Sequence, residues 1–286
     1  MLARRLMNVV PPSVRGVIRP VRMNVGAGLV DMGNTLRGEW NPELVPPRNK
    51  VFGGSLDYTA KGFEFLHYFT QYGGLKSNEN VLDIGCGIGR MARPLTRYLT
   101  TGSYVGMDVM PDGLEWCAEN ISSKYQNFSF QRMDVFNEYY NPGSKTEACD
   151  YRFPFPDGSF DFIYLTSVFT HLLRPDVEQY LSEISRLLSD GGRLFSTWFL
   201  LNDDVMVAMR EDKGIPQIVQ SIGDDEIALV LDNKQPERQI GFFENYVFEL
   251  ISSNQLSIQS PINYGNWCPI DGRDSFHRQD ILIATK

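Results

Sequence analysis

Apolar and polar positions alternate along this chain with two periods, one typical of buried strands and one typical of amphipathic helices. Short runs of branched and aromatic residues, bounded by polar or glycine-rich turns, predict strands. We expect these strands over residues 81–84, 103–108, 128–134, 160–165, 193–200, 258–264 and 281–284.

Between these strands, apolar residues recur every three or four positions, as they do on the buried face of a helix. The predicted helices cover residues 58–72, a segment beginning at Met91 or Ala92, and residues 111–121, 175–188 and 242–254. Asp190, Gly191 and Gly192 are interpreted as the stop signal of the helix over 175–188. Strands that alternate with helices are typical of an α/β fold whose parallel sheet is covered on both faces.

Residues 202–238 show neither period clearly. We expect irregular helices in this stretch, laid over the substrate side of the sheet.

A glycine-rich turn at residues 85–89 organises the rest of the chain. Residues 81–92 read Val-Leu-Asp-Ile-Gly-Cys-Gly-Ile-Gly-Arg-Met-Ala, which predicts a buried strand, a tight turn and the start of a helix. Bare Cα atoms let a ligand approach the backbone, and the free N–H groups of a helix start face that ligand. Asp83 precedes the glycines, and its carboxylate opposes a pyrophosphate but suits a ligand that carries an ammonium group.

Two familiar nucleotide sites fit this turn poorly. A P-loop requires Lys followed by Ser or Thr after its last glycine, whereas Arg90 and Met91 follow Gly89 here. A nicotinamide site favours Gly-x-Gly-x-x-Gly, and the third glycine of this chain comes one residue early.

The order Asp-x-Gly-x-Gly-x-Gly resembles the first motif of the class I S-adenosylmethionine-dependent methyltransferases. Phe-Pro-Asp-Gly-Ser-Phe-Asp at residues 155–161 likewise resembles the fourth-strand motif of small-molecule methyltransferases. The resemblance extends over residues 58–286. It implies an α/β fold with a Rossmann-like, seven-stranded, doubly wound sheet whose last strand is antiparallel. It also implies S-adenosyl-L-methionine as the cofactor.

The first two strand ends contribute most of the predicted cofactor site. By resemblance, the glycine loop holds the amino-acid end of the cofactor. Asp108 ends the second strand, where one carboxylate can accept hydrogen bonds from both ribose hydroxyls. The same side chain could also cap the next helix, and the two roles are compatible. The predicted residues of this half are Asp83, Gly85, Cys86, Gly87, Gly89, Asp108, Val109 and Met110.

The third and fourth strand ends complete the predicted site. By resemblance, Asp134 contacts the adenine amino group and Val135 lies against the base. The loop over 137–151 either helps to cover the adenine or is a surface excursion. Thr166 follows the fourth strand at the edge where parallel sheets bind ligands, so it should face the sulfonium methyl group.

His171 is the candidate catalytic residue. It lies in the segment expected near the methyl group, and an imidazole titrates near neutrality, so it can take a proton from an acceptor hydroxyl. The alternative is that His171 packs against or caps the following helix, in which case Asp271 or His277 is the next candidate base. Trp198, Asn202, Trp267 and Arg273 are further candidates for contact with the acceptor.

We therefore predict a methyltransferase that O-methylates a hydroxyl of a small molecule. Two other classes stay open. One is a module that binds S-adenosylmethionine without catalysis, and the other is a nicotinamide-dependent reductase. The acceptor itself is not readable from these residues.

Composition and charge narrow the class of protein. Of the 286 residues, 42% are hydrophobic and 12% aromatic, which favours a packed core over disorder. A net charge of −8 argues against a general nucleic-acid-binding surface. Four scattered cysteines without a Cys-x-x-Cys pair, and three histidines, give no support for a metal site. Reduced thiols favour a cytoplasmic location.

The amino-terminal segment differs from the rest of the chain. Residues 1–30 carry five arginines and no acid, so the remainder has a net charge of −13, from −8 minus 5. Such an arm could make peripheral contact with anionic lipid or an acidic partner, or it could be a solvated or packing arm. We expect residues 1–50 to form this arm and a proline-rich linker. Residues 51–286 then form the methyltransferase domain, with 202–238 as a substrate-side insertion.

Overall fold

The computed structural model describes residues 44–47, 50–51, 58–138, 140–211, 218–222, 225–268, 270, 275 and 277–286. The predicted basic arm over residues 1–30 lies outside the described residues, as do Asp271 and Arg273.

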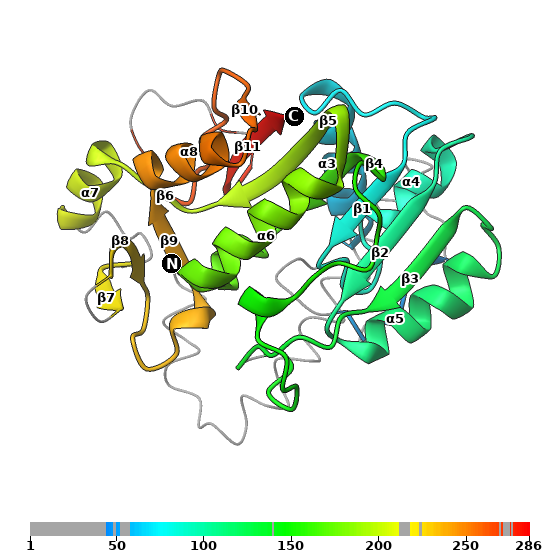
Figure 1. Ribbon diagram of the computed structural model, residues 1–286, viewed down its shortest axis with the longest axis horizontal. Coiled ribbons are helices and arrows are strands. Elements are labelled where there is room, and N and C mark those ends of the chain that lie inside the picture. The colour runs from blue at the N-terminus through cyan, green and yellow to red at the C-terminus, as the bar shows by residue number, and fades with distance from the viewer. Residues whose placement is uncertain are drawn as a thin grey trace, which may run out of the picture.

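A seven-stranded sheet forms the centre of the molecule, with the order β10-β11-β5-β4-β1-β2-β3 (Figure 1). Strands β1 to β5 run parallel to one another, and β11 is antiparallel to both of its neighbours, β5 and β10. This arrangement confirms the predicted Rossmann-like sheet with an antiparallel last strand. The strands are β1 (Val81–Ile84), β2 (Tyr104–Asp108), β3 (Phe128–Arg132), β4 (Phe160–Leu165), β5 (Leu188–Trp198), β10 (Ser257–Ile258) and β11 (Asp280–Thr285).

Helices cover both faces of this sheet. One face packs against α6 (Arg174–Leu187) and α8 (Glu244–Ser253), which lie in front of the sheet in Figure 1. The opposite face packs against α3 (Tyr58–Gln71), α4 (Ala92–Tyr98) and α5 (Pro111–Cys117). After α5 the chain makes one π-helical turn, η3 (Ala118–Ser122), and a 3-10 turn, η4 (Ala148–Asp150), precedes α6.

Alternation along the central strands assigns each side chain to one of these two cores. In β4, Phe162 and Tyr164 join the core under α3, whereas Ile163 and Leu165 join the core under α6. All four side chains are buried because strand residues point alternately to opposite faces and both faces are covered. This explains why the central strands are continuous apolar runs in the sequence.

The expectation of irregular helices over residues 202–238 was correct only in part. Besides α7 (Asp203–Arg210) and the 3-10 turn η6 (Pro236–Arg238), this stretch contributes to a second, four-stranded sheet of order β6-β9-β8-β7. Its strands are β6 (Leu200–Leu201), β7 (Gln220–Ile222), β8 (Asp225–Val230) and β9 (Ile240–Phe243). In β8, Ala228 and Val230 pack into the core under α6, whereas Leu229 packs into a smaller cluster with α7. Because apolar residues lie on both faces of this strand, the sequence does not show a clear alternation.

Several predicted boundaries also changed. The last helix begins at Glu244 rather than at 242, because the preceding residues pair in β9. Helix α6 ends at Leu187, and the chain turns extended at Leu188, so the Asp-Gly-Gly segment lies inside β5. Of the strand expected over 258–264, only Ser257–Ile258 forms a ladder, and Asn263 makes an isolated bridge to Ile281.

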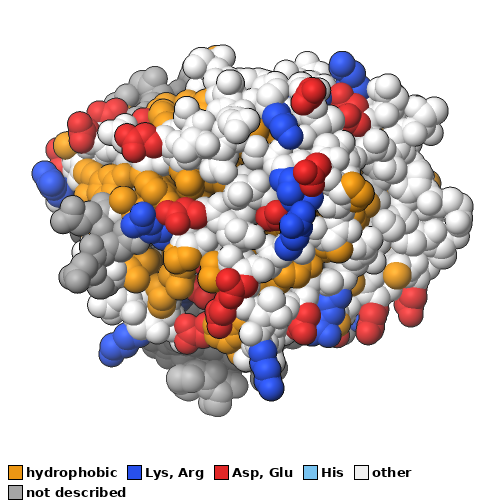
Figure 2. Space-filling model, viewed as in Figure 1, with side chains coloured by type: hydrophobic (Ala, Val, Ile, Leu, Met, Phe, Trp, Pro, Cys, Tyr) orange, Lys and Arg blue, Asp and Glu red, His pale blue; other side chains and the backbone are white. Residues whose placement is uncertain are grey.

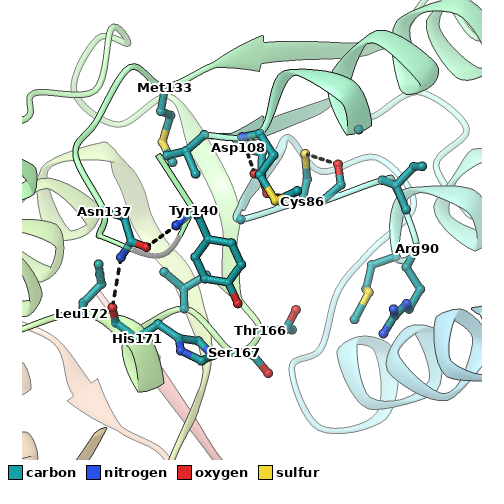
Figure 3. A pocket seen from close by; sticks show the side chains of 18 of the residues that line it. Cys86, Arg90, Asp108, Met133, Asn137, Tyr140, Thr166, Ser167, His171 and Leu172 are labelled. Atoms are coloured by element: carbon teal, nitrogen blue, oxygen red, sulfur yellow. Dashed lines mark hydrogen bonds between the residues drawn. The ribbon is translucent and has the colours of Figure 1, made fainter. Parts of the chain in front are cut away.

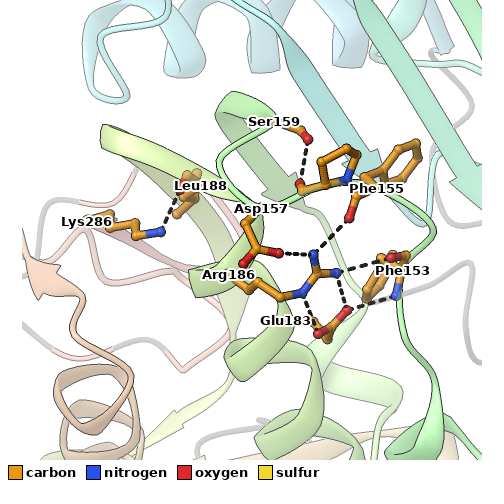
Figure 4. A network of polar contacts seen from close by, with 9 residues as sticks. Phe153, Phe155, Asp157, Ser159, Glu183, Arg186, Leu188 and Lys286 are labelled. Carbon is orange, nitrogen blue, oxygen red and sulfur yellow. Dashed lines mark hydrogen bonds and ion pairs between the residues drawn. The ribbon is translucent and has the colours of Figure 1, made fainter.

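Arg186, on helix α6, forms ion pairs and hydrogen bonds with the segment before β4 (Figure 4). Its guanidinium pairs with Glu183 at 2.6 Å and with Asp157 at 2.8 Å, and it donates to the backbone carbonyls of Phe153 and Phe155. Glu183 in turn accepts the N–H of Phe153 at 2.9 Å. This part of the fourth-strand motif therefore positions β4 through hydrogen bonds and lies apart from the cavity described below.

The surface mixes charge and apolar side chains. On the face that carries α6, Lys, Arg, Asp and Glu side chains are interspersed with bands of hydrophobic ones (Figure 2). Among the described residues, the large hydrophobic side chains that stand out into solvent are Tyr72, Tyr140, Val207 and Val219. No helix in the described part of the chain is long and apolar enough to cross a bilayer.

Candidate functional site

A cavity of about 560 Å³ opens at the carboxyl ends of β1, β2, β3 and β4. This edge is where open α/β sheets bind their ligands, and the volume lies within the roughly 300–1,000 Å³ of small-molecule sites. Of the predicted site residues, the structure brings most to its wall (Figure 3). Those that line it are Gly85, Cys86, Gly87, Asp108, Val109, Met110, Val135, Thr166 and His171.

The glycine loop has the backbone that its sequence predicted. Gly85, Gly87 and Gly89 have φ values of 83°, 56° and 72°, a region that side chains rarely adopt. A side chain at Gly85 would meet Val168, and one at Gly89 would meet Cys117, so these two positions are also packed. At Gly87 a Cβ atom would meet nothing within 4 Å, which leaves this backbone open to the cavity.

Asp108 joins the end of β2 to this loop. Its Oδ2 atom accepts the N–H of Gly87 at 2.7 Å, and its Oδ1 atom accepts the N–H of Met110 at 2.9 Å. Burial raises the pKa of this carboxyl, while hydrogen bonds from the backbone of Met110, Gly87 and Val109 act in the opposite direction. Each carboxylate oxygen can accept a second hydrogen bond, so the group can still receive a pair of ligand hydroxyls.

Asp83 does not line the cavity. It lies in β1 on the face under α3, only 1% exposed, and its Oδ2 atom accepts the hydroxyls of Tyr104 at 2.7 Å and Tyr164 at 2.8 Å. Its Oδ1 atom has no hydrogen-bond partner among the described residues. Burial raises the pKa of Asp83 to about 7, against the lowering effect of the two tyrosines. The structure thus places this carboxylate one layer beneath the glycine loop.

Two further predicted residues lie outside the cavity wall. Gly89 packs against α5, as described above. The Asp134 side chain is 67% exposed, lies 3.6 Å from the guanidinium of Arg132, and accepts a hydrogen bond from Asn141. Its neighbours Met133 and Val135 point the other way, into the cavity. Contact between Asp134 and adenine remains a prediction.

His171 closes the cavity opposite the glycine loop. It ends the 3-10 turn η5 (Phe169–His171), and its Nδ1 atom lies 2.8 Å from the backbone carbonyl oxygen of Glu237. Because a carbonyl only accepts, Nδ1 carries the hydrogen in the neutral ring and Nε2 is left as the acceptor. Burial lowers the pKa of His171, and backbone hydrogen bonds at Glu237 and Arg238 oppose that effect. The ring is therefore neutral near pH 7, as a general base must be.

The loop after β3 forms the wall beside His171. Asn137 donates from its side chain to the carbonyl of His171 at 3.4 Å, and its Oδ1 atom accepts the N–H of Tyr140. The Tyr140 and His171 rings meet edge-on, with their centroids 5.8 Å apart. Figure 3 shows the two side chains at the same wall. Of the two interpretations of residues 137–151, this part favours the one in which the loop covers the site.

Of the described residues predicted to contact the acceptor, one lines the cavity and the others do not. His277 lines the cavity, where its ring meets Phe65 edge-on at 5.0 Å. Trp198 and Trp267 are buried and away from it, and Asn202 caps helix α7 by accepting the N–H of Val205.

Sequence reasoning missed several residues of the wall. Lys61 and Phe65 reach the cavity from α3, and Arg90 reaches it from the end of the glycine loop. Gln239 reaches it from the connection between β8 and β9, directly after the stretch 202–238 in which neither period was clear. Gly113 was missed as well. A Cβ there would lie 2.6 Å from the carbonyl oxygen of Gly87, so a glycine lets α5 pack on the loop. A glycine two residues after the helix-starting Pro111 was the available signal.

Comparisons with known proteins agree with this fold and this loop. A methyltransferase domain family model matches residues 82–196. A sterol 24-C-methyltransferase from Pneumocystis carinii is 28% identical over 207 residues, covering 68% of this chain and 46% of its own length. A 2-methyl-6-phytyl-1,4-hydroquinone methyltransferase from a Synechocystis strain is 24% identical over 54% of this chain and 43% of its own length.

The fold is shared with solved structures. The structure of a protein from Methanosarcina mazei, described as a SAM-dependent methyltransferase, superposes with a TM-score of 0.50 at 19% identity. It covers 78% of this chain and 96% of that one. The chain spans about half the length of the curated relatives it matches. The methyltransferase domain match over residues 82–196 and the shared fold support a class I S-adenosylmethionine-dependent methyltransferase.

Proposed function

We propose that this chain transfers the methyl group of S-adenosylmethionine to a hydroxyl group of a small-molecule acceptor. The observation that carries the finer part of this proposal is the position of His171. Its ring lines the cavity, Nδ1 is committed to the Glu237 carbonyl, and Nε2 remains as a proton acceptor.

The cavity residues fit the cofactor. The open backbone at Gly87 admits a ligand against the loop, and Asp108 presents carboxylate oxygens at the end of β2. Met133 and Val135 give an apolar wall suited to an adenine ring. We assign the glycine loop to the amino-acid end of the cofactor, Asp108 to the ribose, and the segment around Val135 to the base. Thr166 lines the cavity between these groups and His171, and we assign it to the methyl end.

When bound, S-adenosylmethionine supplies a methyl group that its sulfonium sulfur already activates for displacement. The chain contributes alignment of the acceptor, which in well-oriented systems is worth about 7–11 kcal/mol. His171 takes the acceptor's hydroxyl proton at Nε2, and such a base contributes about 10²–10⁴-fold. The buried wall around it excludes water, which would otherwise solvate the attacking oxygen.

Transfer to carbon is the second candidate, because one matched relative is named as a 24-C-methyltransferase. A module that binds the cofactor without catalysis and a nicotinamide-dependent reductase are the other classes.

Two measurements distinguish these functions. Calorimetry with S-adenosylhomocysteine and with NADH tests the cofactor, and we expect binding of the first alone. Acceptor profiling with radiolabelled S-adenosylmethionine and a small-molecule extract then tests catalysis. Label in an alkali-stable methyl ether supports transfer to oxygen, and label on a carbon skeleton supports the second candidate. NADH binding, or cofactor binding without any labelled product, would contradict methyl transfer.

A further inference from the structure

The side chain of Gln239 carries an unused hydrogen-bond donor at the cavity wall. Gln239 lines the cavity, and its Nε2 atom is buried with no hydrogen-bond partner among the residues that the structure describes. Buried amide groups are almost always paired in native proteins, because a lost hydrogen bond to water has to be replaced. An orphan donor on a residue of the cavity wall therefore marks a position where a ligand can complete the pairing once the amide turns toward the cavity.

The backbone holds Gln239 close to the candidate base. Its N–H donates to the carbonyl of Pro236 at 3.3 Å, and its carbonyl accepts the N–H of Leu231 at 3.1 Å. Two residues earlier, the Glu237 carbonyl holds Nδ1 of His171. Gln239 and His171 thus lie at the same wall of the cavity. The turn over residues 236–239 includes Gln239 and also the carbonyl that contacts His171.

Further contacts hold this turn against the wall. The carboxylate of Glu237 accepts the N–H of Glu138 at 2.7 Å, which ties the turn to the loop after β3. The terminal torsion of a glutamine is broad, so the amide can rotate toward the cavity at little energetic cost.

We propose that Gln239 donates a hydrogen bond to a second oxygen of the acceptor, next to the hydroxyl whose proton His171 takes. The acceptor class is then a small molecule with two neighbouring oxygens, such as a vicinal diol, a catechol or a hydroxyketone. An acceptor with a single oxygen leaves the amide unpaired, and sites with such a donor discriminate against analogues that lack the matching group. This assignment rests on the proposed function of the same cavity.

One test needs no acceptor. Replacing an unpaired buried donor with an apolar side chain of similar length removes an unfavourable group, so Gln239→Met should raise the melting temperature. Gln179→Met is the matched control, because Gln179 is half-buried on α6, lies outside the cavity wall and donates to the carbonyl of Tyr151 at 3.0 Å. The control should lose stability. A melting temperature that falls equally in both variants would overturn the assignment, because it would show that Gln239 has a structural partner.

The second test uses catechol and phenol as probes. Calorimetry is run on the full chain saturated with S-adenosylhomocysteine, so that binding is measured without turnover. We expect catechol to bind at least about tenfold more tightly than phenol in the wild type. This preference should disappear in Gln239→Met and in the isosteric Gln239→Glu, whose ionised carboxylate has no N–H group to donate.

The outcomes separate the two proposals. A catechol preference that survives in both Gln239 variants, or the absence of any catechol binding to the wild type, would overturn the role of Gln239. Either result leaves the proposed function standing if S-adenosylhomocysteine still binds and labelled methyl transfer still occurs. Failure of the wild type to bind S-adenosylhomocysteine would overturn both.

Discussion

The Nδ1 atom of His171 lies 2.8 Å from the backbone carbonyl oxygen of Glu237, although the two residues are 66 positions apart in the chain. This contact joins the turn after β4 to the connection between β8 and β9 of the four-stranded sheet, and it fixes which ring nitrogen holds the hydrogen. The segment that was unreadable in sequence therefore positions the candidate base.

The first prediction tests His171 as the base. His171→Ala should lower turnover by about 10²-fold or more and leave the affinity for S-adenosylhomocysteine nearly unchanged, because loss of a base raises the barrier without touching the bound cofactor. His171→Gln keeps a polar side chain that cannot take a proton near neutrality, and it should behave in the same way. Initial rates with radiolabelled cofactor and calorimetry provide the two readouts. Wild-type turnover in both variants would move the base to Asp271 or His277.

The pH dependence of the methyl-transfer rate provides a second test of His171 as the base. Burial lowers the pKa of His171 below its ordinary value of about 6.5, so the neutral form persists to lower pH. The wild-type rate should fall on the acid side with a midpoint below pH 6.5, as the ring becomes protonated and stops accepting a proton. This acid limb should be absent from the residual rate of His171→Gln. An acid limb with its midpoint above 6.5 would argue for another group.

The second prediction concerns the open backbone at Gly87. Gly87→Val should weaken S-adenosylhomocysteine binding by at least about 100-fold, equal to about 3 kcal/mol, because the side chain would occupy space at the cavity wall. Gly74→Val is the matched control. Gly74 has φ 63°, close to the 56° of Gly87, and a Cβ there also meets nothing within 4 Å, but it lies outside the cavity wall. Both variants carry the same backbone strain, so equal loss of binding in the two would contradict the assignment.

The third prediction uses the raised pKa of Asp83. Its pKa is about 7 in the folded chain and about 4 in the unfolded one, so the native state binds the extra proton between these values. The contribution of Asp83 to stability is therefore complete below pH 4 and is lost as the pH rises through 7. Asp83→Asn stays neutral, and its melting temperature should exceed that of the wild type at pH 8.

That advantage should shrink as the pH falls from 7 toward 4, measured by calorimetric unfolding at several pH values. Asp190→Asn, an exposed acid in β5, is the control and should follow the wild type. Parallel stability curves for the wild type and Asp83→Asn would show that Asp83 is ionised in the folded chain at all these values.

The fourth prediction concerns Arg186. Arg186→Leu leaves the Glu183 carboxylate, 9% exposed, without its cation and frees two backbone carbonyls, so it should lower the free energy of unfolding by about 3–5 kcal/mol. Asp157→Asn removes only the partner that is 75% exposed, and it should lower the free energy of unfolding far less, because solvent screens an exposed ion pair. Urea unfolding measures both. Similar losses in the two variants would mean that the exposed pair contributes as much as the buried one.

Much of the architecture could be read from local patterns. The strand over Phe160–Leu165 and the glycine turn after Ile84 came from neighbouring residues alone, because buried parallel strands need continuous apolar runs and tight turns need glycine. The end of each strand then located the cavity, since the carboxyl ends of parallel strands share one edge. The sequence pattern predicted Asp108, Val135 and His171 at this edge, and all three line the cavity.

Tertiary structure alone decided which of the predicted side chains face the cavity. Asp83 and Asp134 both follow the sequence pattern, yet one points into the core beneath the loop and the other out toward solvent. The two carboxylates differ in the face of the sheet on which they lie and in the side chains that pack on that face. A sequence motif specifies neither of these. The sequence could not predict that Gln239 lies at the cavity or that the Glu237 carbonyl contacts His171, for a related reason. Their positions depend on a second sheet whose strands pair across long separations, and such pairing leaves no local period.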